Sequence, residues 1–406
     1  MHYQSHTLGN GLKIIHMPTE GNVSYCGFFI NAGTRDEDDH EHGMAHFVEH
    51  MLFKGTGKRR ATHIINRMEN VGGELNAYTN KEETVIYSVF LEEHFARAVE
   101  LLSDLVFHSQ YPQHEIEKER DVVIDEIHSY EDSPSELIYD EFENMLFAGS
   151  QLGHNILGTP DSLSGFSTAN VKQFVNSHYL PSNIVFFSMG RTPVKKVIYQ
   201  VEKYVSEITG ESISGKRIMP ETVASVTKKE KRDTSQVHAV IGGRAYPMKS
   251  PRRKALLLLN NILGGPGMNS RLNISLREKR GYVYNVESGL TAYTDTGMFT
   301  IYFGSDKQHA YKCVELVDKE LKKLRDVRLT PSQLAAAKKQ LIGQIGVSMD
   351  NHENVSLSLG KSFFHYGHYD SPSEVFSKIE QITASQLLET ANEIYDEKLL
   401  FRLIYD

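Results

Sequence analysis

Two stretches of the sequence, AYTNKEETVIYSVFLEEHFARAVELL (77–102) and AYTDTGMFTIYFGSDKQHAYKCVELV (292–317), follow one pattern without a gap. The second lies 215 residues after the first, and nine residues are identical at that offset, including Tyr78 with Tyr293. Chance gives roughly one or two identities over such a window. The sequence therefore predicts two copies of one fold.

Each copy combines strand patterns with helical patterns. The apolar, β-branched runs at 84–90 and 299–305 predict strands, and so does NIVFFSMG at 183–190. The segments 94–107 and 309–324 have the residue spacing of amphipathic helices. Since strands and helices do not alternate strictly, we predict an α+β fold with two structurally similar domains, each a mostly antiparallel sheet packed with helices.

The length of 406 residues exceeds what one ordinary hydrophobic core supports. A stretch of weak periodicity, containing glycine and serine, runs from 209 to 233. We therefore expect an N-terminal domain over 1–210, a linker over 211–232 and a C-terminal domain over 233–406.

Charge and composition exclude several classes of partner. The net charge of −8 argues against a nucleic-acid partner, and the basic cluster at 228–232 is interpreted as a solvated connector. No apolar run reaches the roughly 20 residues of a membrane span. The N-terminus has no secretory or transit pattern, and Cys26 and Cys313 favour buried thiols in a reducing compartment. We expect a cytoplasmic protein.

The segment GMAHFVEHMLF (43–53) is apolar nearly all round, which predicts a buried helix. His46 and His50 share one face of it, and Glu49 flanks them. Two histidines one turn apart can both bind a zinc ion, while the glutamate acts on water there. The alternative is a pair of core histidines bonded to backbone carbonyls.

A third ligand is needed, and the segment 113–131 offers candidates. At about 100° per residue, one face of this helix carries Ile116, Glu119, Val122, Val123, Glu126, Ile127 and Tyr130. Buried unpaired carboxylates are costly, so a metal ligand and an acid supporting a ligand would explain both glutamates. The alternative is a partly exposed stripe with surface acids.

The second copy lacks the histidine motif. Its counterpart, KALLLLNNILGGPG (254–267), contains no histidine and no acid. The cluster in the first copy therefore serves something that the fold itself does not need.

The motif HFVEH (46–50), followed after 75 residues by a glutamate within ERDVVIDEI (119–127), resembles the inverted-zincin peptidases. This is the family of pitrilysin, insulin-degrading enzyme and the mitochondrial processing peptidase, and its short bacterial members are the most similar. The resemblance covers essentially the whole chain and extends to VGGELNAYTNKEET (71–84), GHNILGT (153–159), LGGPGMNSRL (263–272) and LREKRGYVYNVESG (276–289).

The resemblance implies a role for each residue of the motif. His46, His50 and Glu126 are the implied zinc ligands, Glu49 is the general base, and Glu119 is the catalytic acid behind the ligands. In short family members two subunits close around a chamber, so the resemblance implies a homodimer or a heterodimer with an inactive paralogue.

The resemblance also implies where a peptide substrate lies. An extended peptide pairs with the strand edge Asn76-Ala77-Tyr78. Arg277 and Tyr284, from an inactive C-terminal copy, reach the substrate near the zinc. On the residues alone, the first segment is an ordinary strand after a Gly-Gly turn, and the other two are a charged helix end and a strand residue.

Together these features predict a zinc-dependent endopeptidase that hydrolyses peptides or presequence-like segments, held in extended form inside a closed chamber. The main alternative is a non-catalytic structural or partner subunit of the same fold. A second is a metal-binding regulator, against which Glu49 argues. The acidic run DEDDHEH (36–42) is interpreted as a solvated loop, or else as a segment that attracts basic substrates.

Overall fold

The computed structural model describes residues 2–210 and 216–406. The chain forms two compact units, and both are discontinuous in sequence. The first unit comprises Met1–His128, His154–Ile218 and Met349–Ser371, and the second comprises Ser129–Gly153, Met219–Ser348 and Pro372–Asp406. The continuous domains expected over 1–210 and 233–406 therefore differ from these units, because two segments are exchanged between the halves.

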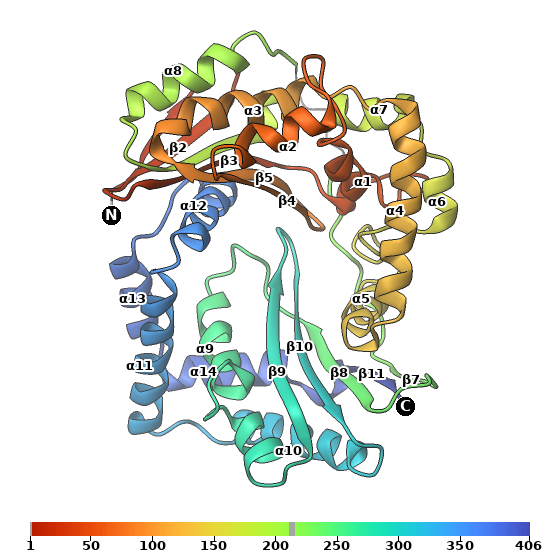
Figure 1. Cartoon of the computed structure of the whole chain (residues 1–406). Coiled ribbons are helices and arrows are strands. Elements are labelled where there is room, and N and C mark those ends of the chain that lie inside the picture. Colours follow the sequence, from red (N-terminus) through yellow and green to blue (C-terminus); the bar gives the residue numbers. More distant parts are fainter. Residues whose placement is uncertain (1, 211–215) are drawn as a thin grey trace. The chain divides into compact units, whose positions relative to one another are not determined.

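The first unit is built on a six-stranded sheet (Figure 1). Its strands, in spatial order, are β1 (Gln4–Thr7), β2 (Lys13–Pro18), β6 (Ile184–Gly190), β3 (Val23–Ile30), β5 (Thr84–Leu91) and β4 (Glu74–Thr79). The pairing of β2 with β6 is parallel and all the others are antiparallel. Strand β4 is therefore an edge of the sheet.

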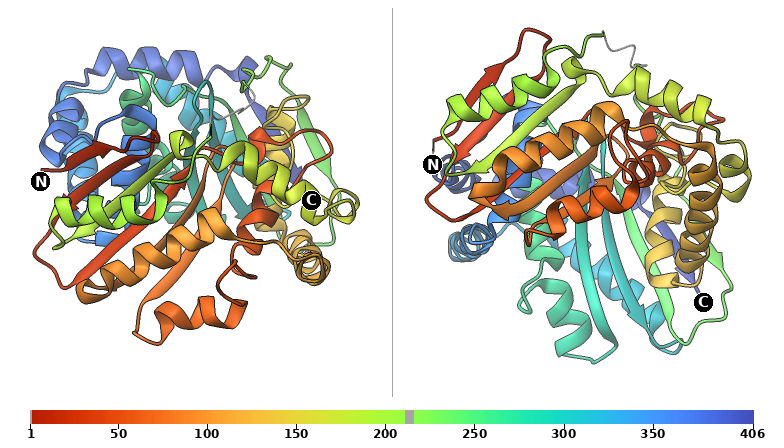
Figure 2. Two further views of the ribbon diagram at one scale, coloured as in Figure 1. Left: turned by 90° about the horizontal axis from the view of Figure 1, so that it is seen from above. Right: turned by 45° about the horizontal axis from the view of Figure 1, so that its top comes forward.

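Helices pack on both faces of this sheet (Figures 1 and 2). The helices of the first unit are α1 (Met44–Met51), α2 (Ala61–Glu69), α3 (Phe95–His108), α4 (Gln113–Glu131), α6 (Pro160–Ser164), α7 (Thr168–His178), α8 (Val194–Val205) and α12 (His352–Tyr366). The short helical turns are η1 (Thr34–Asp36), η2 (Glu92–His94) and η3 (Pro181–Asn183). Helices α1, α3 and α8 share one core with the sheet. On the other face, α12 forms a separate core with β2, β3 and β6.

The second unit repeats this topology with five strands. In spatial order they are β7 (Thr227–Glu230), β11 (Phe401–Tyr405), β8 (Val237–Arg244), β10 (Gly297–Ser305) and β9 (Val283–Ala292). The pairing of β7 with β11 is parallel and the others are antiparallel. This order matches that of β2, β6, β3, β5 and β4, so the two mostly antiparallel sheets predicted from the repeat are confirmed.

The helices of the second unit also lie on both faces of their sheet. They are α5 (Pro134–Leu146), α9 (Arg253–Gly264), the π-helical segment η4 (Asn273–Glu278), α10 (Ala310–Asp326), α11 (Pro331–Ser348), α13 (Pro372–Glu380) and α14 (Ala384–Ile394), with a short turn η5 (Glu397–Leu399). Residues of α9, α10 and α14 build one core, and α5 covers the other face.

Helices α5 and α12 are exchanged reciprocally. Helix α5 belongs to the first half of the sequence but packs on the second sheet, and α12 does the reverse. At the repeat offset of 215 residues, α5 falls on the sequence of α12. Each sheet is therefore covered on one face by its own half and on the other by the corresponding helix of the other half.

The structure confirms the strands predicted at 84–90, 299–305 and 183–190, and it confirms both predicted helices as α3 and α10. The expected linker needs correction. Residues 211–215 lie outside the described residues, but Thr227–Glu230 is strand β7, paired along β11. Among the residues that the structure describes, no helix is both long and apolar enough to cross a membrane.

Candidate metal centre

Helix α1 begins at a tightly fixed turn. Gly43 has φ +94°, and a Cβ there would lie 2.7 Å from the carbonyl oxygen of Leu157. The backbone N–H groups of Gly43 and Ala45 donate to the carboxylate of Glu37, at 2.9 and 2.8 Å. An acceptor at a helix N-terminus satisfies donors that the helix itself leaves free. Glu37 therefore fixes the start of the helix that carries the histidines.

This contact corrects the solvated-loop interpretation of residues 36–42. Glu37 and Glu41 are buried, with 5% and 7% of their surface exposed, and Asp36 forms an ion pair with Arg217. Asp38 and Asp39 remain exposed. Most of the acidic run is thus structural.

Three predicted ligands converge. Nε2 of His46 lies 3.8 Å from Oε2 of Glu126, and Nε2 of His50 lies 3.6 Å from the same oxygen. The two imidazole rings have centroids 4.6 Å apart. One donor atom from each of the three side chains lies within 4.8 Å of the other two. Helices α1 and α4 therefore bring together two imidazoles and one carboxylate around a common point.

The core-histidine alternative does not describe these side chains. His46 is buried, yet its Nδ1 has no hydrogen-bond partner among the residues that the structure describes. Burial, together with the nearby His50, lowers the pKa of His46 to about 3. His46 is therefore a neutral imidazole, which is the form that binds a metal.

Glu119 holds His50 from behind. Nδ1 of His50 donates to Oε1 of Glu119 at 2.9 Å, which leaves Nε2 directed towards Glu126. Lys54 forms an ion pair with the other oxygen of Glu119. Burial alone raises the pKa of Glu119, but the bonds from His50 and Lys54 outweigh it and keep that pKa below its ordinary value. Glu119 is therefore an anion that fixes the ring of His50.

The carboxylates around His50 also shift its pKa. Burial lowers its pKa, but Glu119, Glu126 and Glu49 outweigh burial and raise it above the ordinary value. These carboxylates favour a positive charge at the point where the donor atoms meet. The donor set of two imidazoles and one carboxylate, with this electrostatic preference, fits a zinc ion.

Glu49 lies on α1 between the two histidines and is half-buried. Burial raises its pKa, while a hydrogen bond with the side chain of Thr79 partly opposes that rise. Thr79 ends the edge strand β4, and its hydroxyl lies 3.3 Å from that of Thr84. The acid expected to act as the base is thus connected to the sheet edge.

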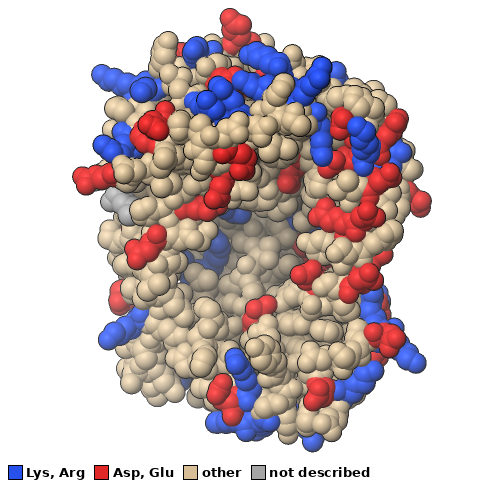
Figure 3. Space-filling view, in the orientation of Figure 1, with Lys and Arg blue, Asp and Glu red and all other residues tan. Residues whose placement is uncertain are grey.

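The predicted stripe on α4 is narrower than its periodicity indicated. Ile116, Glu119, Val123 and Ile127 are buried and Glu126 is half-buried, but Val122 and Tyr130 are 49% and 38% exposed. Most of the remaining acids of α4 are exposed, and acidic side chains gather where this helix runs (Figure 3). The alternative is therefore wrong for Glu119, which is buried, but the partly exposed stripe that it expected is present.

The predicted substrate segment lies on an edge strand. Asn76, Ala77 and Tyr78 are central residues of β4, which pairs with β5 on one side and ends the sheet on the other. Their backbone can therefore pair with an added strand.

Arg277 and Tyr284 lie together in the second unit. Arg277 is in η4, and its guanidinium carbon lies 5.7 Å from the ring centroid of Tyr284. Tyr284 is 83% exposed. Their expected contact with a substrate stays a prediction.

Two residues of the site were missed in the sequence. Lys54 follows His50 by four residues, just beyond the end of α1, and a lysine so close to the histidines was a usable signal. Thr79 gave no local signal, because its contact with Glu49 depends on how α1 packs against β4.

Another group of possible ligands contains Asp38, His40 and Glu41. Asp38 and His40 are exposed, so water already satisfies them. Such exposed acidic groups are common without an ion.

Comparison with known proteins matches two successive parts of the chain to two family descriptions. The family described as Insulinase (Peptidase family M16) matches residues 14–160, and the Peptidase M16 inactive domain matches residues 165–341. A protein of Bacillus subtilis named as an uncharacterized zinc protease is 31% identical over 98% of this chain and 97% of its own length. A probable mitochondrial-processing peptidase subunit beta of Arabidopsis thaliana is 27% identical, over 98% of this chain and 77% of its own.

Solved structures agree on the fold. The crystal structure of a protease from Helicobacter pylori has a TM-score of 0.93 at 20% identity, and the match covers 100% of this chain and 99% of that one. The histidine and glutamate cluster lies within the part matched by the peptidase family, and the second copy lies largely within the part matched by the inactive domain. With the Bacillus relative matching almost from end to end, this chain belongs to the insulinase family, M16.

Proposed function

We propose that this chain is a zinc-dependent endopeptidase whose metal is held by His46, His50 and Glu126. The observation that carries the proposal is the convergence of these three donors within 4.8 Å, with Glu49 left outside the donor set on the same helix. The relatives named as zinc proteases support it.

The chemistry divides between the metal and the chain. When bound, zinc polarises the scissile carbonyl and lowers the pKa of water to about 7. Glu49 takes a proton from the attacking water and gives it to the leaving amine. Burial raises the pKa of Glu49 and so makes its carboxylate a better proton acceptor. Glu119 keeps the ring of His50 oriented throughout.

The substrate in this proposal is a peptide in extended form. It adds to the free edge of β4 along Asn76, Ala77 and Tyr78, so that backbone hydrogen bonds bind it without regard to sequence. Thr79 at the end of the same strand keeps Glu49 beside the bound backbone. Arg277 and Tyr284 supply a cation and a phenol that hold a substrate carbonyl or developing oxyanion.

We further propose that two such chains, or this chain and an inactive paralogue, enclose the peptide in a chamber. The Bacillus relative has nearly the same length, so each would contribute one pair of units. Presequence-like segments are the proposed substrates, supported by the Arabidopsis relative's name. The free thiols Cys26 and Cys313 support action in the reducing cytoplasm.

Glu49→Gln tests the catalytic role. Bound zinc and cleavage of a quenched fluorescent peptide library are measured for the native protein, for Glu49→Gln and for Glu69→Gln, an exposed acid on α2. We expect all three to bind zinc and only Glu49→Gln to lose turnover, by about 1,000-fold or more. A native protein that binds zinc without cleaving any peptide would instead be a non-catalytic subunit, and equal cleavage by Glu49→Gln would exclude Glu49 as the base.

A further inference from the structure

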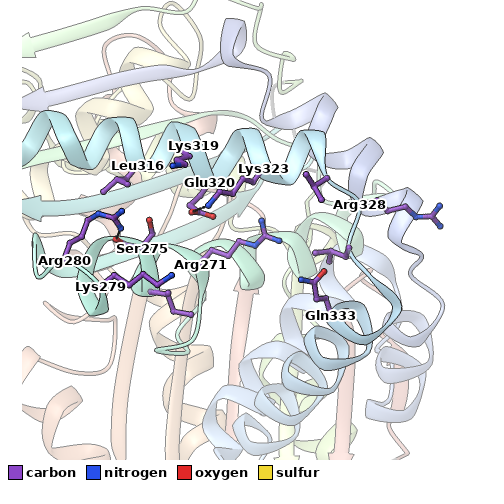
Figure 4. Close-up of a pocket in the computed structure, with 13 residues that line it drawn as sticks. Arg271, Ser275, Lys279, Arg280, Leu316, Lys319, Glu320, Lys323, Arg328 and Gln333 are labelled. Carbon is purple, nitrogen blue, oxygen red and sulfur yellow. Dashed lines mark hydrogen bonds and ion pairs between the residues drawn. The ribbon is translucent and has the colours of Figure 1, made fainter.

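A cavity of about 440 Å³ lies within the second unit, and none of its lining residues belongs to the metal centre. It is bounded by η4, by α10 and by the segment between α10 and α11 (Figure 4). Its lining contains one carboxylate, that of Glu320, and six cationic side chains: Arg271, Lys279, Arg280, Lys319, Lys323 and Arg328. A positive cavity of this kind stands out in a chain whose net charge is −8.

The single carboxylate does not neutralise the cavity. Oε1 of Glu320 accepts from Nζ of Lys323 at 2.6 Å, so these two charges compensate each other. Arg280 donates to the carbonyl oxygen of Ser275, which carries no net charge. Among the residues that the structure describes, no ion pair reaches Lys279 or Lys319. The cavity thus keeps a positive charge that its own lining leaves unpaired.

Arg271 is the most informative of these cations. Its side chain is half-buried and extends from the start of η4 towards the space beside α10 (Figure 4). Within the described part of the chain, its guanidinium has no hydrogen-bond or ion-pair partner. Burial lowers the pKa of Arg271, although the charge of Glu320 opposes that effect. Partial loss of hydration without a partner costs a guanidinium free energy, which an anion in the cavity would offset.

The chemistry of the lining indicates the class of anion. A guanidinium presents parallel N–H donors that match phosphate oxygens, and lysine ammonium groups add charge without a fixed direction. Arg328 points away from the cavity at its rim (Figure 4), so the inner charge comes from the other cations. Several adjacent cations favour a ligand with several negative charges over a single carboxylate.

We propose that this cavity binds a small, multiply charged phosphate compound, with Arg271 bonded to its phosphate oxygens and Lys279, Arg280 and Lys319 around its outer charges. An inorganic polyphosphate and a nucleoside triphosphate share this chemistry. This site is separate from the proposed peptidase function, because none of the residues that line it has a role in that function.

Calorimetric titration of tripolyphosphate into the full chain tests the proposal at low, fixed ionic strength. Three proteins are compared: native, Arg271→Gln and Lys312→Gln, the last being an exposed lysine of α10 outside the cavity lining. We expect saturable binding to the native protein, a loss of about tenfold or more in affinity for Arg271→Gln, and a change below about twofold for Lys312→Gln. Polyphosphates also bind zinc, but neither variant alters the metal ligands, so the difference between variants isolates the cavity.

A second variant keeps the test decisive if Arg271→Gln fails to fold. Lys319 is exposed, so Lys319→Gln should leave the fold intact. This variant should weaken tripolyphosphate binding several-fold more than Lys312→Gln does. ATP titrated in parallel separates the two sources: tighter binding than tripolyphosphate indicates a nucleotide, and equal or weaker binding indicates a polyphosphate. No saturable binding to the native protein, or equal losses for the cavity variants and Lys312→Gln, would overturn the proposal.

Discussion

His50 is fixed at one ring nitrogen, and the other is directed towards Glu126. Nδ1 donates to Glu119 at 2.9 Å, and Nε2 lies 3.6 Å from Glu126. A hydrogen bond to the far nitrogen of a metal-binding imidazole fixes both its tautomer and its orientation. Glu119 is itself fixed by Lys54. The geometry of the metal centre thus depends on a carboxylate outside the donor set.

Glu119→Gln should therefore weaken the binding of zinc without removing a ligand. The amide can still accept from His50 but carries no charge, so we expect zinc affinity to fall by about 10- to 100-fold. Competition with a chelator measures this affinity. Glu117→Gln, an exposed acid two residues earlier on α4, is the matched control. Equal affinities for the two variants would contradict the role assigned to Glu119.

The sequence predicted this site because helical spacing alone determines much of it. His46 and His50 share a face in any helix, and Glu119 and Glu126 fall on the apolar face of another. Periodicity does not show which other element packs against each turn of a helix. Val122 lies on the apolar face of α4 and is nevertheless exposed.

Helix α12 lies so close to β3 that a side chain does not fit at one position. A Cβ on Gly360 would lie 2.6 Å from the ring of Phe29 and 2.9 Å from that of Phe187, and both rings are fully buried. Local sequence signals do not account for Gly360, since a glycine within a helix is normally unfavourable. The close packing of α12 on the sheet explains why a glycine stands at this position.

Gly360→Ala should destabilise the protein by about 1–3 kcal/mol, because the rings around it have little room to move. Gly343 is an exposed glycine within α11 with nothing in the way of a Cβ. Gly343→Ala should instead stabilise by roughly 1 kcal/mol through helix propensity. Urea denaturation followed by circular dichroism measures both. A stabilising effect of Gly360→Ala would show that α12 is not packed as described.

An ion cluster also fastens α12 to the sheet. Glu83, next to β5, accepts from Lys361 at 2.5 Å and from His365 at 2.8 Å, and it is 1% exposed. Burial alone raises its pKa, but the bond from His365 and the charge of Lys361 outweigh burial and lower the pKa to about 2. The ionised form of Glu83 is therefore favoured by the fold.

This shift predicts a pH dependence. A carboxylate with a depressed pKa in the folded state stabilises the protein above its unfolded pKa, near 4.5, and loses that effect as the pH falls through about 2. The shift corresponds to roughly 3 kcal/mol. Glu83→Gln should be destabilised by about that amount at pH 7, and the difference from native should shrink below pH 4.5. For Glu20→Gln, an exposed acid, the difference should stay near zero. A difference for Glu83→Gln that stays constant down to pH 3 would contradict this account.

At the scale of the whole molecule, the internal repeat predicted two related sheets and the structure contains them. The exchange of α5 and α12 was not predictable in the same way. Both helices lie at corresponding places in the repeat, and each packs its apolar face on the sheet of the other half. Which sheet each one covers is decided by the path of the chain, which no periodicity records. Continuous domain boundaries were therefore the wrong expectation.

The central claim is that His46, His50 and Glu126 together hold one zinc ion. Diffraction data from zinc-loaded crystals, collected on both sides of the zinc absorption edge, locate the ion directly. The account predicts one strong anomalous peak about 2.0–2.2 Å from a nitrogen of each histidine and an oxygen of Glu126. A peak at Asp38, His40 and Glu41 instead, or no peak near the two histidines, would contradict it.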